Sequence, residues 1–167
     1  GAGKTCGSIA IAEGLKDFNK IVVMTPASLE QNYMNELKFC GDDIFKKNHH
    51  WEFINNVPEN AEKIEELTKI LNLPVDVVRK NNGVWAINTS PPSSSGNTGN
   101  YGRLSALQQK SLNNQLDAMI KNKYEFIHYN GLRDISKYEA RGVRNGGNFF
   151  NNKVVIIDEV HNFVGTI

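Results

Sequence analysis

The stretch VVIIDEVH, residues 154–161, decides the fold class of this chain. Its four branched apolar residues predict a central strand that is buried on both faces, as in a parallel sheet. Two carboxylates, Asp158 and Glu159, follow directly at the end of that strand. Ligands of open α/β sheets bind beyond the carboxyl ends of the strands. The stretch therefore predicts a parallel sheet with an acidic site at its edge.

The two carboxylates have distinct chemical uses at such an edge. Asp158 can hold Mg²⁺ through its water shell, because Mg²⁺ prefers oxygen ligands and keeps several waters. Glu159 can orient or deprotonate an attacking water. The alternative is a strand that ends in a solvated acidic turn, and these residues alone do not exclude it.

The opposite end of the chain carries GAGKT, residues 1–5, the second half of the phosphate-binding pattern G-x-x-x-x-G-K-[ST]. Glycines let backbone N–H groups close around phosphate oxygens, and a following helix adds partial positive charge. Lys4 would reach the β- and γ-phosphates, and the Thr5 hydroxyl would bind Mg²⁺. The alternative is a glycine-rich terminus with a solvated lysine. Its occurrence upstream of the acidic strand end favours a nucleotide site.

Strands alternate with helices between these two ends, which predicts a parallel α/β sheet. Apolar runs predict strands at 21–24, 51–54, 84–87 and 124–129, and helical spacing predicts helices at 7–16, 28–40, 59–71 and 104–122. Ser28 with Gln31 forms a capping-box pattern at the start of the second helix. Residues 81–83 (Asn-Asn-Gly) predict a turn. Two loops are expected, a Ser/Pro/Gly-rich one at 90–100 and a glycine-rich one at 141–148.

Composition excludes several classes of protein. The 167 residues carry a net charge of +1, which argues against binding that depends mainly on a basic surface. The longest apolar run is far shorter than the roughly 20 residues that span a bilayer, and no secretory signal is present. Cys6 and Cys40 match no zinc spacing and give no disulfide framework, so a reducing intracellular compartment is expected.

Three short motifs resemble those of superfamily II helicases. DEVH (158–161) resembles the D-E-x-H form of motif II, and Gly3-Lys4-Thr5 resembles motif I. TPASL (25–29) resembles motif Ia and is similar to a stretch of Swi/Snf-type remodelling ATPases. Tyr129 and Asn130 stand where these proteins place a strand-end motif that faces nucleic acid. In style the chain is most similar to the helicase-like transcription ATPases of large cytoplasmic DNA viruses, the group of the poxvirus early transcription factor and its nucleoside triphosphate phosphohydrolase relative.

The resemblance implies a RecA-like P-loop NTPase domain that uses ATP and Mg²⁺. Lys4, Asp158, Glu159 and His161 would be catalytic: Lys4 on the phosphates, Asp158 on the metal together with Thr5, Glu159 as the base, and His161 as the link between nucleotide state and nucleic acid. The remaining expected contacts are Gly1, Ala2, Gly3 and Cys6 with the nucleotide, and Thr25, Pro26, Ala27, Tyr129 and Asn130 with the nucleic acid.

The resemblance covers nearly the whole chain, so residues 1–167 are expected to be part of a first motor domain, cut at both ends. Motif III, the second motor domain and its arginine finger are expected after Ile167, and the isolated fragment is expected to be inactive. An insertion is expected at about 41–123, with a flexible loop at 88–102. The expected partners are DNA or RNA, contacted mainly through the backbone, and RNA polymerase or other transcription machinery, with no membrane. A viral source implies the virion and the host cytoplasm.

Three other functions remain open. A GTPase or transporter ATPase would not be expected to carry TPASL or His161. A translocase that remodels complexes without unwinding would have the same motifs. A non-catalytic interaction module could keep a relic fold, although intact Lys4, Asp158 and Glu159 argue against it.

Other residues are interpreted without a catalytic role. His49 and His50 are assigned to a solvated loop rather than a metal site, and His128 to packing or hydrogen bonding. Trp51 and Trp85 are assigned to packing, with stacking on a base as the alternative. The last group is assigned to a solvated surface, with phosphate contact as the alternative: Arg133, Lys137, Arg141 and Arg144.

Overall fold

A computed structural model describes residues 3–15, 20–90, 99–128, 138–140, 142 and 147–161. The chain divides into two compact units, Gly1–Gly41 with Lys123–Ile167, and Asp42–Asn122. Among the described residues, no helix combines the length and apolar character needed to cross a membrane. The second unit occupies nearly the stretch in which the sequence predicts an insertion. That it is inserted into a family fold stays a prediction.

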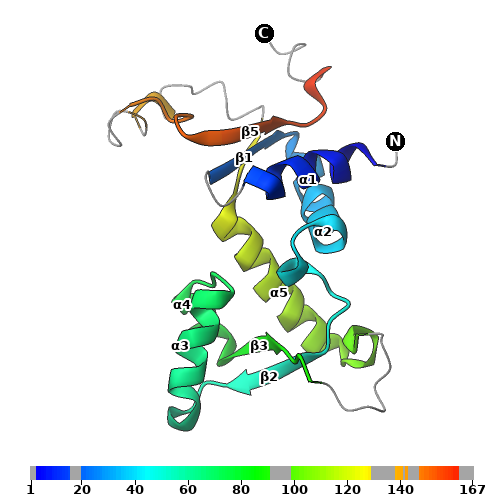
Figure 1. The fold of residues 1–167 in the computed structure, drawn as a ribbon, viewed down its shortest axis with the longest axis vertical. Coiled ribbons are helices and arrows are strands. Elements are labelled where there is room, and N and C mark those ends of the chain that lie inside the picture. Colours follow the sequence, from blue (N-terminus) through cyan, green and yellow to red (C-terminus); the bar gives the residue numbers. More distant parts are fainter. Residues whose placement is uncertain are drawn as a thin grey trace. The chain divides into compact units, whose positions relative to one another are not determined.

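The first unit contains a three-stranded parallel sheet in the order β4-β1-β5 (Figure 1). Its elements in chain order are α1 (Lys4–Leu15), β1 (Lys20–Thr25), the 3-10 turn η1 (Ala27–Leu29), α2 (Glu30–Cys40), β4 (Tyr124–His128) and β5 (Lys153–Ile157). The predicted mixed α/β class with a parallel sheet flanked by helices is confirmed. The arrangement is compatible with a RecA-like domain.

The register of the sheet brings three strand ends to one edge. Thr25 at the end of β1 pairs with His128 at the end of β4, and Met24 pairs with Ile157 at the end of β5. The N–H of Asp158 then donates to the carbonyl of Met24 at 2.9 Å. The carboxyl ends of β1, β4 and β5 therefore lie at the same edge of the sheet.

The central strand is β1, not β5. Five consecutive residues of β1 are buried, whereas Val155 and Ile157 of β5 are 38% and 42% exposed. The prediction that residues 154–157 form the central strand is wrong for the described sheet. A continuous apolar run reports burial of the two faces of a strand and does not reveal whether a second strand lies on each side of it.

Both faces of β1 are covered, which explains its unbroken apolar sequence. On one face, Tyr33 of α2 packs edge-on against Phe126 of β4, with ring centroids 6.0 Å apart. On the other face, Val22 and Met24 form a core cluster with Ile127 and Phe149. Each face thus supplies buried apolar area, the main favourable term in folding.

The beginnings of the two helices differ from the sequence predictions. The first helix begins at Lys4, three residues before the predicted start. The second begins at Glu30, with no side-chain cap, because residues 27–29 form a 3-10 turn closed by Leu29 N–H on the Pro26 carbonyl at 2.9 Å. Ser28 therefore lies inside a turn, and the predicted capping box with Gln31 is wrong.

The second unit contains a two-stranded antiparallel sheet with helices beside it (Figure 1). Its elements are η2 (Asp43–Phe45), β2 (Trp51–Asn55), η3 (Pro58–Asn60), α3 (Ala61–Ile70), α4 (Val75–Asn81), β3 (Gly83–Ile87), η5 (Tyr101–Arg103) and α5 (Ala106–Lys123). The helix expected at 59–71 is thus shorter, and α4 was not predicted. The turn at 81–83 is confirmed: Asn82 is left-handed, with φ 53°, and Gly83 begins β3 where any Cβ would meet the Ile54 carbonyl oxygen.

Side-chain amides form hydrogen bonds with the backbone at the outer edges of this two-stranded sheet. Gln115 of α5, wholly buried, accepts from the N–H of Trp85 and donates to its carbonyl, both at 2.8 Å. Asn100 does the same for Trp51, at 2.8 and 2.9 Å. Each amide acts as a one-residue strand and satisfies backbone groups that burial would otherwise leave unpaired. Both tryptophans are 3% exposed, which confirms their assignment to packing.

Replacing Gln115 should destabilise the second unit. Gln115→Ala leaves the N–H and the carbonyl of Trp85 buried without partners, which costs about 1–3 kcal/mol for each unsatisfied group. Trp51 and Trp85 are the two tryptophans of the chain, so tryptophan fluorescence during urea unfolding reports this unit. Asn114→Ala, an exposed neighbour on the same helix, is the matched control and should leave the midpoint unchanged.

Candidate functional site

The amino end of α1 has the geometry of an anion site. Gly3 has φ of +104°, in the region that favours glycine, and its carbonyl accepts the N–H of Gly7 at 2.8 Å to close the first turn. Lys4 and Thr5 are the first two helical residues, Lys4 exposed and Thr5 half-buried. The first N–H groups of a helix have no partner within the helix and carry partial positive charge. This end can therefore receive phosphate oxygens.

Asp158 lies within electrostatic reach of Lys4. Burial raises the pKa of the Asp158 carboxyl, the charge of Glu159 raises it further, and a backbone hydrogen bond from Glu159 and the charge of Lys4 lower it. Lys4 and Asp158, which are far apart in the sequence, are thus close enough for their charges to interact. Because burial disfavours the charged form of this half-buried carboxyl, a nearby cation would stabilise its ionised state.

Glu159 is held in an uncommon conformation. Its φ is +51°, a left-handed value that few residues other than glycine adopt. Its carboxylate lies 3.2 Å from Nδ1 of His161. The imidazole is therefore close enough to interact with this carboxylate. Strained residues of this kind cluster at functional sites.

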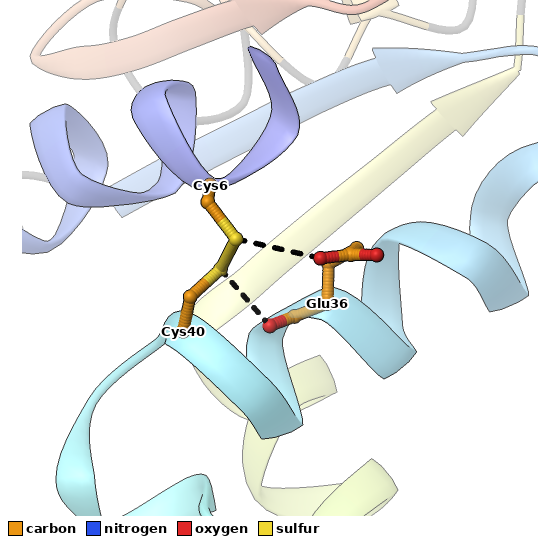
Figure 2. A group of neighbouring side chains, drawn as sticks. All are labelled: Cys6, Glu36 and Cys40. Atoms are coloured by element: carbon orange, nitrogen blue, oxygen red, sulfur yellow. Dashed lines mark hydrogen bonds between the residues drawn. A yellow bond between two sulfur atoms is a disulfide. The ribbon is translucent and has the colours of Figure 1, made fainter. Parts of the chain in front are cut away.

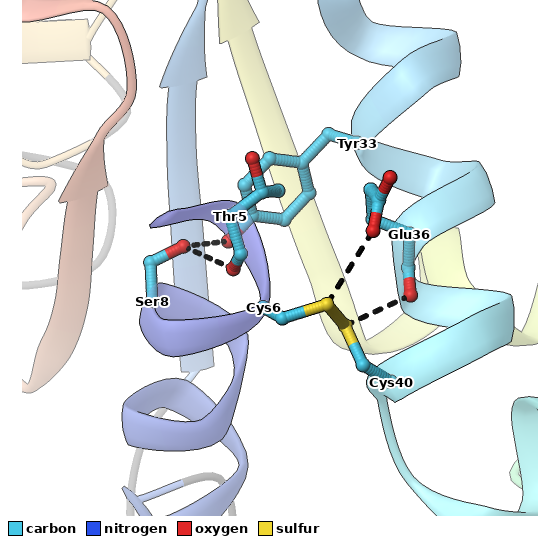
Figure 3. The surroundings of a disulfide bond; sticks show 6 residues. All are labelled: Thr5, Cys6, Ser8, Tyr33, Glu36 and Cys40. Atoms are coloured by element: carbon cyan, nitrogen blue, oxygen red, sulfur yellow. Dashed lines mark hydrogen bonds between the residues drawn. A yellow bond between two sulfur atoms is a disulfide. The ribbon is translucent and has the colours of Figure 1, made fainter. Parts of the chain in front are cut away.

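Tyr33 braces the first turn of α1 from α2. Its hydroxyl lies 3.1 Å from Oγ of Ser8, which donates to the Thr5 carbonyl at 2.8 Å (Figure 3). Burial raises the pKa of Tyr33, the hydrogen bond with Ser8 lowers it, and the charges of Asp158 and Glu13 raise it. The helical spacing at 28–40 predicts nothing of this role of Tyr33. The signal it missed was the pairing of a polar buried tyrosine with Ser8, one turn after Thr5.

A second tyrosine ties the far end of α1 to the sheet. The hydroxyl of Tyr124, at the start of β4, donates to Oε1 of Glu13 at 2.5 Å. Burial and this carboxylate both raise the pKa of Tyr124 far above its usual range. Neither residue was singled out from the sequence. Together the two tyrosines hold α1 at both ends, and so fix where Lys4 and Thr5 lie.

The predicted nucleic-acid residues are only partly described. Thr25 is wholly buried, with its hydroxyl oxygen lacking a hydrogen-bond partner in the described part of the chain. Pro26 is half-buried and has no N–H, whereas Ala27 is exposed. A backbone N–H that donates to a phosphate in this segment would therefore belong to Ala27 or to a residue that follows it. Tyr129 and Asn130, like Gly1 and Ala2, lie outside the described residues.

The remaining assignments divide in the same way. His128 lies 2.6 Å from Oε2 of Glu30, which confirms a hydrogen-bonded histidine. His49 is half-buried, bonded to the Asp43 carbonyl at 2.7 Å, and belongs to no metal-binding group among the described residues. The four basic residues of 133–144 lie outside the described residues.

The donor atoms at the site suit a magnesium nucleotide. Thr5 and Asp158 offer hard oxygen ligands, which Mg²⁺ prefers, and Lys4 with the α1 N–H groups offers positive charge for phosphates. The raised pKa of Asp158 marks a carboxyl that a cation would stabilise. The residues present therefore fit both groups.

Cys6 and Cys40 form a disulfide, with Cα atoms 5.8 Å apart (Figure 3). The prediction that these cysteines give no disulfide is wrong. Their separation of 34 positions hides the contact, because α1 and α2 return antiparallel to the sheet and pack on each other. Cys6 directly follows Thr5, so the covalent bond reaches the first turn of α1.

Comparison with curated proteins finds a similarity to "Putative ATP-dependent RNA helicase R563" of Acanthamoeba polyphaga mimivirus. The two are 32% identical over 77 residues, which cover 46% of this chain and 13% of the viral protein. No family model and no solved structure matches the chain. The similarity supports a helicase-like relationship with a protein of a large DNA virus, at a coarse level.

Because Tyr33 and Tyr124 hold α1 through their hydroxyl groups, we predict that the first unit loses stability in alkali. Their folded-state pKa values are raised, so their contribution is complete below the unfolded pKa of about 10 and is lost as pH rises above it. Unfolding free energy should fall by about 1.4 kcal/mol per pH unit for each tyrosine that keeps its proton. Urea unfolding followed by far-ultraviolet circular dichroism between pH 9 and about 11.5 measures the slope.

Tyr33→Phe and Tyr124→Phe should each flatten that slope. Tyr101→Phe, in the second unit, is the matched control and should keep it. An equal slope in all three variants would show that α1 is not held by these hydroxyl groups.

Proposed function

We propose that this chain is the ATP-binding part of a superfamily II helicase or translocase, which couples ATP hydrolysis to nucleic acid. One observation carries the proposal: Lys4 and Asp158, from opposite ends of the sequence, interact electrostatically at the carboxyl edge of a parallel sheet. The similarity to the viral protein supports the helicase class. Each motif alone could be a chance pattern. The interaction between Lys4 and Asp158 makes this alternative less favoured.

In the proposed reaction, water attacks the γ-phosphate of ATP. The N–H groups at the start of α1 and the ammonium of Lys4 hold the phosphates and offset the charge that develops on them. Thr5 and Asp158 would hold Mg²⁺, which when bound neutralises phosphate charge. Glu159 accepts or orients the water proton, and its contact with His161, 3.2 Å away, fixes the carboxylate.

His161 is the proposed link to the nucleic acid. It contacts the base of the reaction, so a change in Glu159 on hydrolysis would move the imidazole. The track would be contacted through sugar and phosphate by Ala27, Pro26, Tyr129 and Asn130, which positions a strand without reading its sequence. Thr25 is wholly buried and would act only by holding this segment in place. The relative is named as an RNA helicase, so RNA is the first track to test. Transcription machinery and an intracellular viral setting complete the proposal.

The direct test is ATP hydrolysis by the full-length protein. Lys4→Ala and Glu159→Gln should each lower kcat at least about 100-fold, the loss seen when one transition-state contact is removed. Glu159→Gln keeps the shape of the side chain and should still bind a fluorescent ATP analogue, whereas Lys4→Ala should bind it weakly. A phosphate-release assay and fluorescence anisotropy make the two measurements.

Lys20→Ala and Glu139→Gln are matched controls, because both residues are exposed and neither belongs to the proposed site. They should keep wild-type rates. Unchanged hydrolysis in the Lys4 and Glu159 variants would remove the enzyme function and favour a non-catalytic interaction module. Stimulation by single-stranded RNA, without strand separation in a duplex assay, would identify a translocase rather than a helicase.

A further inference from the structure

Three metal-ligating side chains converge between α1 and α2, and none of them belongs to the proposed magnesium ligands. Glu36 and Cys40 are four positions apart on α2 and so share one face of the helix, and Cys6 approaches them from α1 (Figure 2). The two sulfurs and a carboxylate oxygen all lie within 4.8 Å of one another. Cys6 and Cys40 are half-buried and Glu36 is exposed, so the cluster is open on one side.

In the oxidised form, Glu36 lies beside both sulfur atoms of the disulfide. Its Oε2 lies 3.4 Å from Sγ of Cys6, and its carbonyl lies 3.3 Å from Sγ of Cys40. A disulfide sulfur has no proton to donate, so neither contact is a hydrogen bond while the disulfide is intact. Within the described ranges, no lysine, arginine or histidine forms an ion pair with Glu36. Among the described residues, the Glu36 carboxylate thus has no cationic partner, contacts the Cys6 sulfur and lies within 4.8 Å of the Cys40 sulfur.

We propose that the reduced cluster of Cys6, Glu36 and Cys40 binds a thiophilic divalent cation of the zinc class. Zinc accepts cysteine thiolates and carboxylates in a tetrahedral set, and three protein ligands leave a fourth position for water. The exposed side of the cluster provides that position. Two sulfur ligands disfavour Mg²⁺ and Ca²⁺, which take oxygen ligands. None of these observations rests on the proposed ATPase function.

The disulfide is the form of the cluster that excludes the cation. Reduction adds two electrons and two protons to the sulfur–sulfur bond, supplied by two molecules of a low-molecular-weight thiol that leave as their own disulfide. Cation binding then releases the two thiol protons, because thiolates are the ligands. A low-molecular-weight disulfide reverses the exchange and frees the cation.

Cobalt(II) is the probe for this site, because thiolate ligation gives it a near-ultraviolet charge-transfer band. The full chain is reduced with dithiothreitol, freed of it without oxygen and titrated with Co²⁺. One equivalent should bind with the band, and Zn²⁺ should displace it. Protein oxidised with glutathione disulfide should show no band. Reduced protein that shows no band would overturn the proposal.

Two variants and a chemical test make the assignment specific. Cys40→Ser should lose tight binding, and Glu36→Gln should weaken it at least about tenfold, the loss that even an outer partner of a metal ligand causes. Glu59→Gln, an exposed glutamate of the second unit, is the matched control and should bind normally. Unchanged affinity in Glu36→Gln would exclude the three-ligand site.

Alkylation of the unmodified chain keeps the test independent of variant folding. In reduced protein, Zn²⁺ should protect Cys6 and Cys40 together from iodoacetamide, as measured by mass spectrometry. Equal labelling with and without Zn²⁺ would contradict the site.

Discussion

The parallel register of β1 with β4 and β5 is the constraint on which the rest of the first unit depends. It aligns Thr25 with His128 and Met24 with Ile157, so the carboxyl ends of all three strands lie at one edge. The hydrogen bond from Asp158 N–H to the Met24 carbonyl extends that register past the end of β5. Because α1 runs back against the sheet, its first turn meets the same edge. The position of Asp158 relative to Lys4 follows from strand pairing.

Hydrogen bonds from side-chain hydroxyl and amide groups then hold these helices and strands in place. Tyr33 and Tyr124 hold α1 at its two ends through Ser8 and Glu13. In the second unit, Gln115 satisfies the edge of β3. These groups are buried and paired, so each specifies one arrangement at a modest net gain in stability but a large cost when a partner is lost. The disulfide adds a covalent connection between α1 and α2.

Local patterns predicted the elements, and long-range contacts account for the errors. The apolar runs at 21–24 and 154–157 and the helical spacing at 104–122 each predicted an element that is present. The position of β5 in the sheet, the pairing of Cys6 with Cys40 and the amide of Gln115 depend on residues 30 or more positions away, which periodicity does not report. Ser28 failed as a cap because Pro26 starts a tighter turn. The order of the motifs predicted that Lys4 and Asp158 lie together. It did not predict the hydrogen bonds of Tyr33 and Tyr124 that hold α1 in place.

The central claim is that Lys4 and Asp158 act on one bound nucleotide. A double-mutant cycle tests it most directly: the affinity for a fluorescent ATP analogue with Mg²⁺ is measured for the full-length protein, Lys4→Ala, Asp158→Asn and the double variant. Residues that share a ligand should show a coupling free energy of about 1 kcal/mol or more. Losses that add to within about 0.3 kcal/mol would show two independent sites and contradict the account.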